Sequence, residues 1–132
     1  MRVVLDAYAV LTHLEGESAG QKVTRLLKEA ERGRAECFIN AVNLAEVLYV
    51  TQRRKGRRAA LDIYALIESW PLEVVGVTEE ILLSASDVKA RHRVSLADAF
   101  AAATARVLGA EVMTGDEEFR ALEGEVSARW LK

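Results

Sequence analysis

The chain has 132 residues, of which 51% are hydrophobic, with 18 Lys and Arg against 20 Asp and Glu, one Cys and one Pro. This length and composition predict a single globular domain over residues 1–132 and exclude a disordered, collagen-like or low-complexity chain. The lone Cys37 excludes an internal disulfide and a Cys-based zinc site, and no apolar stretch reaches the roughly 20 residues that span a bilayer, so we expect a cytoplasmic protein without a membrane partner. The net charge of −2 gives no overall attraction to nucleic acid.

The first half of the chain alternates short β-branched runs with segments whose apolar residues recur at helical spacing. A basic segment, Arg53–Arg58, is predicted to be a break between two helices. Pro71, the only proline, marks a stop because it cannot continue a helix. The predicted elements are a strand at Val3–Leu5, a helix at Gln21–Glu31, a strand at Cys37–Ile39, a helix at Val42–Thr51 and a helix from the basic segment to about Ser69.

The second half continues this alternation and carries clear helix-capping signals. Thr78 is placed to cap a helix whose first turn holds two glutamates, and Ser95 with Asp98 forms a capping-box pattern. The predicted elements are a strand at Leu72–Val77, a helix after Thr78, a helix from Ser95 to Gly109, a strand at Glu111–Met113, a short helix through Leu122 and an edge strand at Val126–Leu131. Short strands alternating with helices predict an α/β fold with a parallel sheet.

Only five of the twenty acidic residues are aspartates, and three of them stand at strand ends or helix starts. Asp6 directly follows the first strand, Asp116 follows the fourth strand, and Asp98 lies in the first turn of the helix between them. Ligands of an open parallel sheet bind at the carboxyl ends of its strands, where such side chains can converge. Taken singly, each aspartate also fits a plain capping role.

A fourth acid, Glu46, shares a helix face with Asn43 because the two are three residues apart. Glu46 and Asp98 both stand among apolar neighbours, where a lone ionised carboxylate is costly. Glu46 taken alone also fits a solvated surface charge. Clustered Asp and Glu oxygens are the ligands that Mg²⁺ and Mn²⁺ accept, and a bound cation would offset the cost. The acids together therefore predict a divalent-metal site able to act on a phosphate.

Four short segments that contain these acids occur in a characteristic order along the chain. They are Val3-Val4-Leu5-Asp6, Asn43-Leu44-Ala45-Glu46, Leu96-Ala97-Asp98-Ala99, and Thr114-Gly115-Asp116 followed by Phe119. Each segment is common alone, but four in this order in a chain of this length are specific. The sequence resembles the PIN domain family, and most closely its VapC-type toxin ribonucleases from toxin–antitoxin pairs.

The resemblance implies a compact three-layer α/β/α fold with a central, mostly parallel sheet of about five strands. It also implies Mg²⁺- or Mn²⁺-dependent hydrolysis of single-stranded RNA, a homodimer, and silencing by a cognate antitoxin protein. One departure is Ala7, where the family often has Ser or Thr. Carried over by position, the catalytic and metal-binding quartet is Asp6, Glu46, Asp98 and Asp116, with Asn43 and Thr114 as supporting polar groups.

Two groups of basic residues are candidates for RNA binding. The first consists of the five cations of the basic segment, Arg53, Arg54, Lys55, Arg57 and Arg58, and the second of Arg91 and Arg93. One interpretation is a rim that grips phosphates and makes binding salt-dependent. The other is solvated helix ends without a ligand.

Several other phosphate-processing folds fit less well. A haloacid-dehalogenase-type enzyme needs a second Asp two positions after the first, where this chain has Tyr8. A response-regulator receiver needs an Asp after the third strand and a Lys after the last, and Val74–Thr78 and Val126–Lys132 match this poorly. A P-loop enzyme is excluded because its Gly-rich motif is missing. The remaining alternatives are a non-catalytic module that binds RNA or protein on the same fold and, less favoured, another metal-dependent phosphohydrolase.

Overall fold

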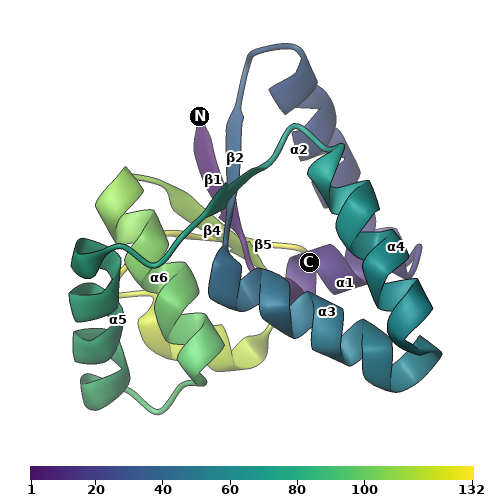
Figure 1. The fold of residues 1–132 in the computed structure, drawn as a ribbon. Coiled ribbons are helices and arrows are strands. Elements are labelled where there is room, and N and C mark those ends of the chain that lie inside the picture. The colour runs from purple at the N-terminus through teal and green to yellow at the C-terminus, as the bar shows by residue number, and fades with distance from the viewer.

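The computed structural model describes all of residues 1–132 and is built around a five-stranded sheet (Figure 1). The strand order is β3-β2-β1-β4-β5, and every neighbouring pair is parallel. The strands are β1 (Arg2–Leu5), β2 (Glu36–Asn40), β3 (Glu73–Val75), β4 (Glu111–Thr114) and β5 (Ala128–Trp130). The predicted α/β fold with about five strands and a parallel sheet is confirmed.

Helices cover both faces of the sheet. They are α1 (Ala7–Leu14), α2 (Gln21–Glu31), α3 (Ala41–Lys55), α4 (Arg57–Glu68), α5 (Glu79–Arg91) and α6 (Leu96–Leu108), with 3₁₀ turns η1 (Ser18–Gly20) and η2 (Glu117–Leu122). Alternating residues of β1 divide the core. Val3 and Leu5 pack with residues of α1 to α4, whereas Val4 packs with residues of α5, α6 and η2. Figure 1 shows the α3–α4 pair and the α5–α6 pair on opposite sides of the sheet. The three-layer prediction is therefore confirmed.

The predicted caps form as expected. The Thr78 hydroxyl accepts a hydrogen bond from the Ile81 N–H at 3.2 Å, and Ser95 accepts one from the Asp98 N–H at 3.0 Å. Gly109 ends α6 in the left-handed conformation that glycine tolerates, with φ 63°. None of the helices is long and apolar enough to cross a membrane.

Three parts of the secondary structure differ from the sequence prediction. The sequence does not predict helix α1, because its eight residues are mostly apolar and show no clear helical periodicity. The strands β3 and β5 are three residues each, shorter than predicted. The break predicted for Arg53–Arg58 is wrong: Arg53 to Lys55 form the last turn of α3, and only Gly56, with φ 94°, interrupts the helix. Arg and Lys are good helix formers, so the single glycine ends α3.

The strand order reverses between β1 and β4. From β1 the chain moves outward to β2 and β3, and it then returns to the other side of β1 for β4 and β5. Leu5 pairs in register with Met113, so β1 and β4 end at the same edge of the sheet. Such a point is where open α/β sheets bind their ligands.

Candidate active site

Asp6 and Asp116 lie at this reversal, each at the start of a helical segment; Asp6 directly follows β1, and Asp116 follows β4 after Gly115. An oxygen of Asp6 accepts the Ala9 N–H at 2.8 Å and caps α1. An oxygen of Asp116 accepts the Glu118 N–H at 3.0 Å and caps η2. Both aspartates therefore have the capping role considered from the sequence. A cap uses only part of a carboxylate's acceptor capacity, so the remaining lone pairs stay available to a ligand.

Asp98 belongs to the first turn of α6 and is only 5% exposed. Its Oδ2 atom is buried and has no hydrogen-bond partner. Buried carboxylate oxygens in folded proteins are nearly always hydrogen-bonded or bound to a cation, because an unsatisfied one costs free energy. An oxygen of this kind is suited to bind a cation.

Carboxylates from α6 and η2 come close together at this point. One oxygen from each of Asp98, Asp116 and Glu118 lies within 4.8 Å of the other two. Glu118 was not among the predicted site residues. The sequence holds only a weak signal for it, a Glu two positions after Asp116, and only the 3₁₀ turn η2 brings its side chain back toward Asp98.

The electrostatics link Asp6 and Glu46 to the same cluster. Burial raises the pKa of Asp6 from 3.8 to about 7, the charges of Asp98 and Asp116 add to this, and hydrogen bonds with Thr114 and Ala9 oppose it. Burial and the charge of Asp116 raise the pKa of Asp98 to about 6, with Glu46 contributing. Burial, followed by the charge of Asp116, also raises the pKa of Glu46. All four carboxylates of the predicted quartet therefore share one electrostatic environment.

No basic side chain neutralises this environment. None of Asp6, Glu46, Asp98, Asp116 and Glu118 forms an ion pair with a Lys, Arg or His. Several partly buried carboxylates without counter-charges are costly, and a divalent cation with oxygen ligands removes that cost. The donor set of carboxylate oxygens suits Mg²⁺ or Mn²⁺ rather than zinc or copper.

The two predicted supporting residues hold the acidic elements together. The Thr114 hydroxyl accepts the Asp116 N–H at 3.0 Å and also acts on the Asp6 carboxylate, where it lowers the pKa, so it links the ends of β1 and β4. The buried Asn43 donates its side-chain N–H to the Ala97 carbonyl at 3.3 Å, which ties α3 to the start of α6. Both residues position the acids.

The basic segment lies away from the acids, at the far end of α3 (Figure 1). Arg53 and Lys55 are seven and nine residues beyond Glu46, about 10 and 14 Å along a helix axis. The Arg53 guanidinium stacks over Tyr49 at 4.9 Å, and Arg58 pairs with Asp62 at 3.4 Å. The structure does not bring this segment into the acidic cluster.

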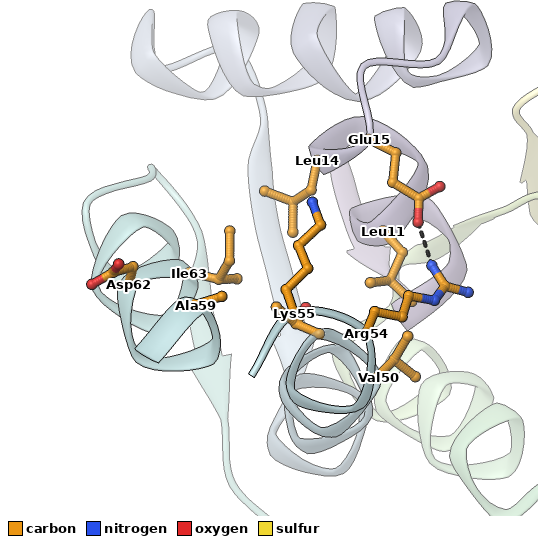
Figure 2. A pocket seen from close by; sticks show the side chains of 10 residues that line it. Leu11, Leu14, Glu15, Val50, Arg54, Lys55, Ala59, Asp62 and Ile63 are labelled. Carbon is orange, nitrogen blue, oxygen red and sulfur yellow. Dashed lines mark hydrogen bonds and ion pairs between the residues drawn. The ribbon is translucent and has the colours of Figure 1, made fainter. Parts of the chain in front are cut away.

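Part of the basic segment lines a separate cavity of about 280 Å³ between α1, α3 and α4 (Figure 2). Apolar side chains of all three helices form its walls, including Leu11, Leu14 and Ile63. Figure 2 shows the Arg54 side chain paired with Glu15 across its rim. Arg54 is therefore partly neutralised by a residue from another helix.

The two arginines of the second basic group differ in their ion pairing. Arg91 forms ion pairs with Asp87 at 2.8 Å and Glu125 at 2.6 Å, so its charge is largely compensated. Arg93 is exposed and forms no ion pair, and it lies five residues before Asp98. Of the two, Arg93 is the one whose charge is uncompensated within the chain.

The sequence matches the family model of the PIN domain over residues 3–125. The comparison with curated proteins finds no match.

Solved structures with similar folds come from bacterial toxin–antitoxin systems. DNA-bound VapBC from Salmonella typhimurium has a TM-score of 0.78 at 18% identity, covering 100% of this chain and 99% of that one. VapBC2 from Rickettsia felis, bound to a promoter DNA fragment, has a TM-score of 0.77 at 15% identity and 98% coverage of both chains. VapC20 from Mycobacterium tuberculosis, a sarcin-ricin loop cleaving toxin, has a TM-score of 0.70 at 23% identity, covering 90% and 93%. At these identities the similarity concerns the fold alone.

Proposed function

Because the chain belongs to the PIN domain family, we propose that it is an Mg²⁺- or Mn²⁺-dependent ribonuclease that hydrolyses phosphodiester bonds in single-stranded RNA. The observation that carries the proposal is the orphaned, buried Oδ2 of Asp98 within an uncompensated acidic cluster. The cluster stands at the strand-order reversal, where this type of sheet binds its ligands.

In this proposal the catalytic and metal-binding residues are Asp6, Glu46, Asp98 and Asp116. A divalent cation held by such carboxylates supplies charge neutralisation at a phosphate and activation of water. Asp98 and Asp116 would offer their oxygens to the cation from two elements, α6 and the start of η2, and their closeness in the fold supports this assignment. Thr114 and Asn43 keep these elements in place through the hydrogen bonds described above.

The test is cleavage of a fluorescent single-stranded RNA by the purified protein with Mg²⁺, with Mn²⁺ and with excess EDTA. We expect cleavage with a metal and none with EDTA. The variant Asp98→Asn should lose cleavage, whereas Asp62→Asn, an exposed aspartate on α4, serves as the matched control and should keep it. Unchanged cleavage by Asp98→Asn would remove the metal-site proposal. RNA binding without cleavage under every metal condition would favour the non-catalytic module instead.

We further propose that the protein is the toxin of a type II toxin–antitoxin pair and acts in the cytoplasm on RNA there. Support comes from the fold, which is similar to chains in structures named VapBC. The test is whether a small neighbouring reading frame that encodes a DNA-binding protein yields a product that co-purifies with this chain and suppresses its RNA cleavage. If no neighbouring gene product binds the chain, the toxin assignment fails while the ribonuclease proposal stands.

A homodimer is part of the same proposal. Large apolar side chains remain exposed on α5 and at the start of α6, including Leu82 at 49%, Leu83 at 62% and Leu96 at 54%. Exposed apolar surface is costly in water, and a second copy is one way to cover it. Light scattering of the purified protein should give twice the mass of one chain, and Leu83→Glu should shift it toward one chain without loss of helical signal. A monomeric wild-type protein would exclude the dimer.

A further inference from the structure

A second cavity, of about 220 Å³, is lined by segments that also carry Asp6 and Asp116. Its lining comes from α1, from the turn after β4, from η2 and from the segment around β5. Tyr8 is two residues from Asp6, and Gly115 directly precedes Asp116. We name this cavity the Tyr8 pocket. Two residues of its lining are therefore sequence neighbours of two of the four proposed catalytic carboxylates.

The ring of Tyr8 packs directly on the turn that presents Asp116. A Cβ atom added at Gly115 would lie 2.4 Å from Cε1 and 2.8 Å from Cδ1 of Tyr8, closer than atoms can approach. Glycine at this position therefore lets the aromatic ring lie against the backbone. Tyr8 is nevertheless 46% exposed. An aromatic ring fixed on one side and open to solvent on another is a surface on which a planar group can stack.

The Tyr8 pocket also contains a planar cation. The Arg120 guanidinium lies over the Trp130 ring at 4.2 Å from its centroid, and Glu117 binds it at 2.7 Å. These contacts hold the guanidinium in place before any ligand arrives. Unpaired RNA bases stack on aromatic rings and on guanidinium planes of this kind.

The charge and size of the Tyr8 pocket favour a base over a phosphate. Its lining includes two acidic side chains, Glu17 and Glu117, and two basic ones, Arg120 and Lys132, so it has no excess positive charge to attract an anion. Its volume is below the roughly 300–1,000 Å³ typical of pockets for drug-sized ligands. A single planar, neutral ring system suits such a space.

We propose that the Tyr8 pocket binds one unpaired base of the RNA, next to the phosphate that meets the acidic cluster, by stacking on Tyr8 and on the Arg120–Trp130 pair. This inference rests on the proposed ribonuclease function. It assigns to the pocket a part in selecting single-stranded RNA, because a base held in a duplex cannot enter it without being unstacked and unpaired.

The experiment measures RNA affinity in the Asp98→Asn background, so that binding is read without cleavage. A 5′-labelled hexamer and the same hexamer with one abasic position are titrated against proteins with Tyr8, Tyr8→Phe, Tyr8→Leu and Tyr8→Ala. We expect Tyr8→Ala to weaken binding of the intact hexamer by about 5- to 100-fold, the range for loss of one stacked base. Tyr8→Phe should bind as the parent does, and Tyr8→Leu should be weakened although it keeps the bulk of the side chain.

The abasic hexamer separates stacking from other effects. Scanning the abasic position should find one hexamer for which Tyr8→Ala no longer weakens binding, because the partner of the ring is already absent. Equal affinity of Tyr8→Ala and its parent for the intact hexamer, or an equal loss for every abasic hexamer, would overturn the proposal. Either result with intact cleavage by the wild-type protein would leave the ribonuclease function standing. Absence of wild-type cleavage with both metals would instead remove that function itself.

Discussion

Two carboxylates of this protein show opposite ways of placing a negative charge. Glu125 is bound by Arg91, His92 and Arg106, and hydrogen bonds from the first two lower its pKa to about 2. Asp98 has no cationic partner, and burial with the nearby Asp116 raises its pKa to about 6. The first charge is satisfied within the chain and stabilises it. The second has no counter-charge within the chain.

The pairing of individual charges distinguishes the two regions better than the number of charges does. The molecule has 18 basic residues, enough to neutralise every member of the acidic cluster, yet it places them elsewhere. Structural ion pairs perturb pKa values as strongly as functional sites do, so the direction of the shift is the useful signal. Asp6, Glu46 and Asp98 combine pKa values raised by burial with the absence of a counter-charge, whereas the lowered pKa values of Asp87 and Glu125 mark ion pairs.

The largest difference between the two regions is expected when a carboxylate of each is replaced by an amide. Asp116→Asn should reduce RNA cleavage by at least about a hundredfold, because metal sites contribute several kcal/mol to such reactions, while the capping role of residue 116 persists in Asn. Glu125→Gln should keep cleavage within about twofold but lower the free energy of unfolding by about 1–2 kcal/mol. Cleavage assays and urea unfolding on both variants measure this. A stable Glu125→Gln variant without activity would show that the two regions are not separable.

The buried, unpaired charge of Asp6 is expected to lower the stability of the metal-free protein at high pH. The folded protein holds the proton of Asp6 more tightly than the unfolded chain does, so the stability contribution of Asp6 falls as pH rises from about 4 to about 7. Asp6→Asn should therefore stabilise the metal-free protein at pH 8, by up to about 4 kcal/mol at 1.36 kcal/mol per pKa unit. Urea unfolding in EDTA at pH 8 and at pH 5 measures the effect, which should shrink at the lower pH. Lower stability of Asp6→Asn at pH 8 would contradict it.

The same raised pKa values predict how metal affinity depends on pH. Protons compete with a cation for Asp6 and Asp98, so Mn²⁺ affinity should fall as pH drops through about 7 and then about 6. Calorimetry at pH 8, 7 and 6 should show a loss approaching about tenfold per pH unit for each proton displaced. In the variant Asp6→Asn, Mn²⁺ affinity should depend less on pH near pH 7. Constant affinity across this range would show that the titrating carboxylates are not the ligands.

The smallest effect is expected at the basic segment. Arg57 lies beyond Gly56 at the start of α4 and forms no ion pair, so Arg57→Glu tests the RNA-binding interpretation without breaking a contact. We expect cleavage of a short RNA to change by less than about twofold, because the segment is remote from the acids. On a long RNA, a real phosphate contact would reduce the slope of log affinity against log salt by about one. A large loss of cleavage of the short RNA would instead show that the basic segment acts at the acidic cluster.

The positions of the aspartates were readable from the sequence, because a strand end and a helix cap are both local features. Asp6 directly follows an apolar run, Asp116 follows one after Thr114 and Gly115, and parallel pairing then brings both to one edge. Glu118 was not readable, since its approach to Asp98 depends on the shape of η2. The pairing of Arg54 with Glu15, 39 residues apart, was equally hidden, and with it the partial neutralisation of the basic segment. The proposed metal ligands could be predicted from local sequence features. Which charges stay unpaired depends on long-range packing and could not.

The pairing of Leu5 with Met113 has a consequence for the order of synthesis. The carboxylates at positions 6 and 116 become neighbours only when β4 docks beside β1, after most of the chain has left the ribosome. Domains generally fold as units, so this pairing waits until the segment that forms β4 has emerged. A nascent chain that stops before residue 116 holds Asp6, Glu46 and Asp98 but cannot complete the cluster. The proposed metal site is therefore complete only when synthesis of the chain is nearly finished.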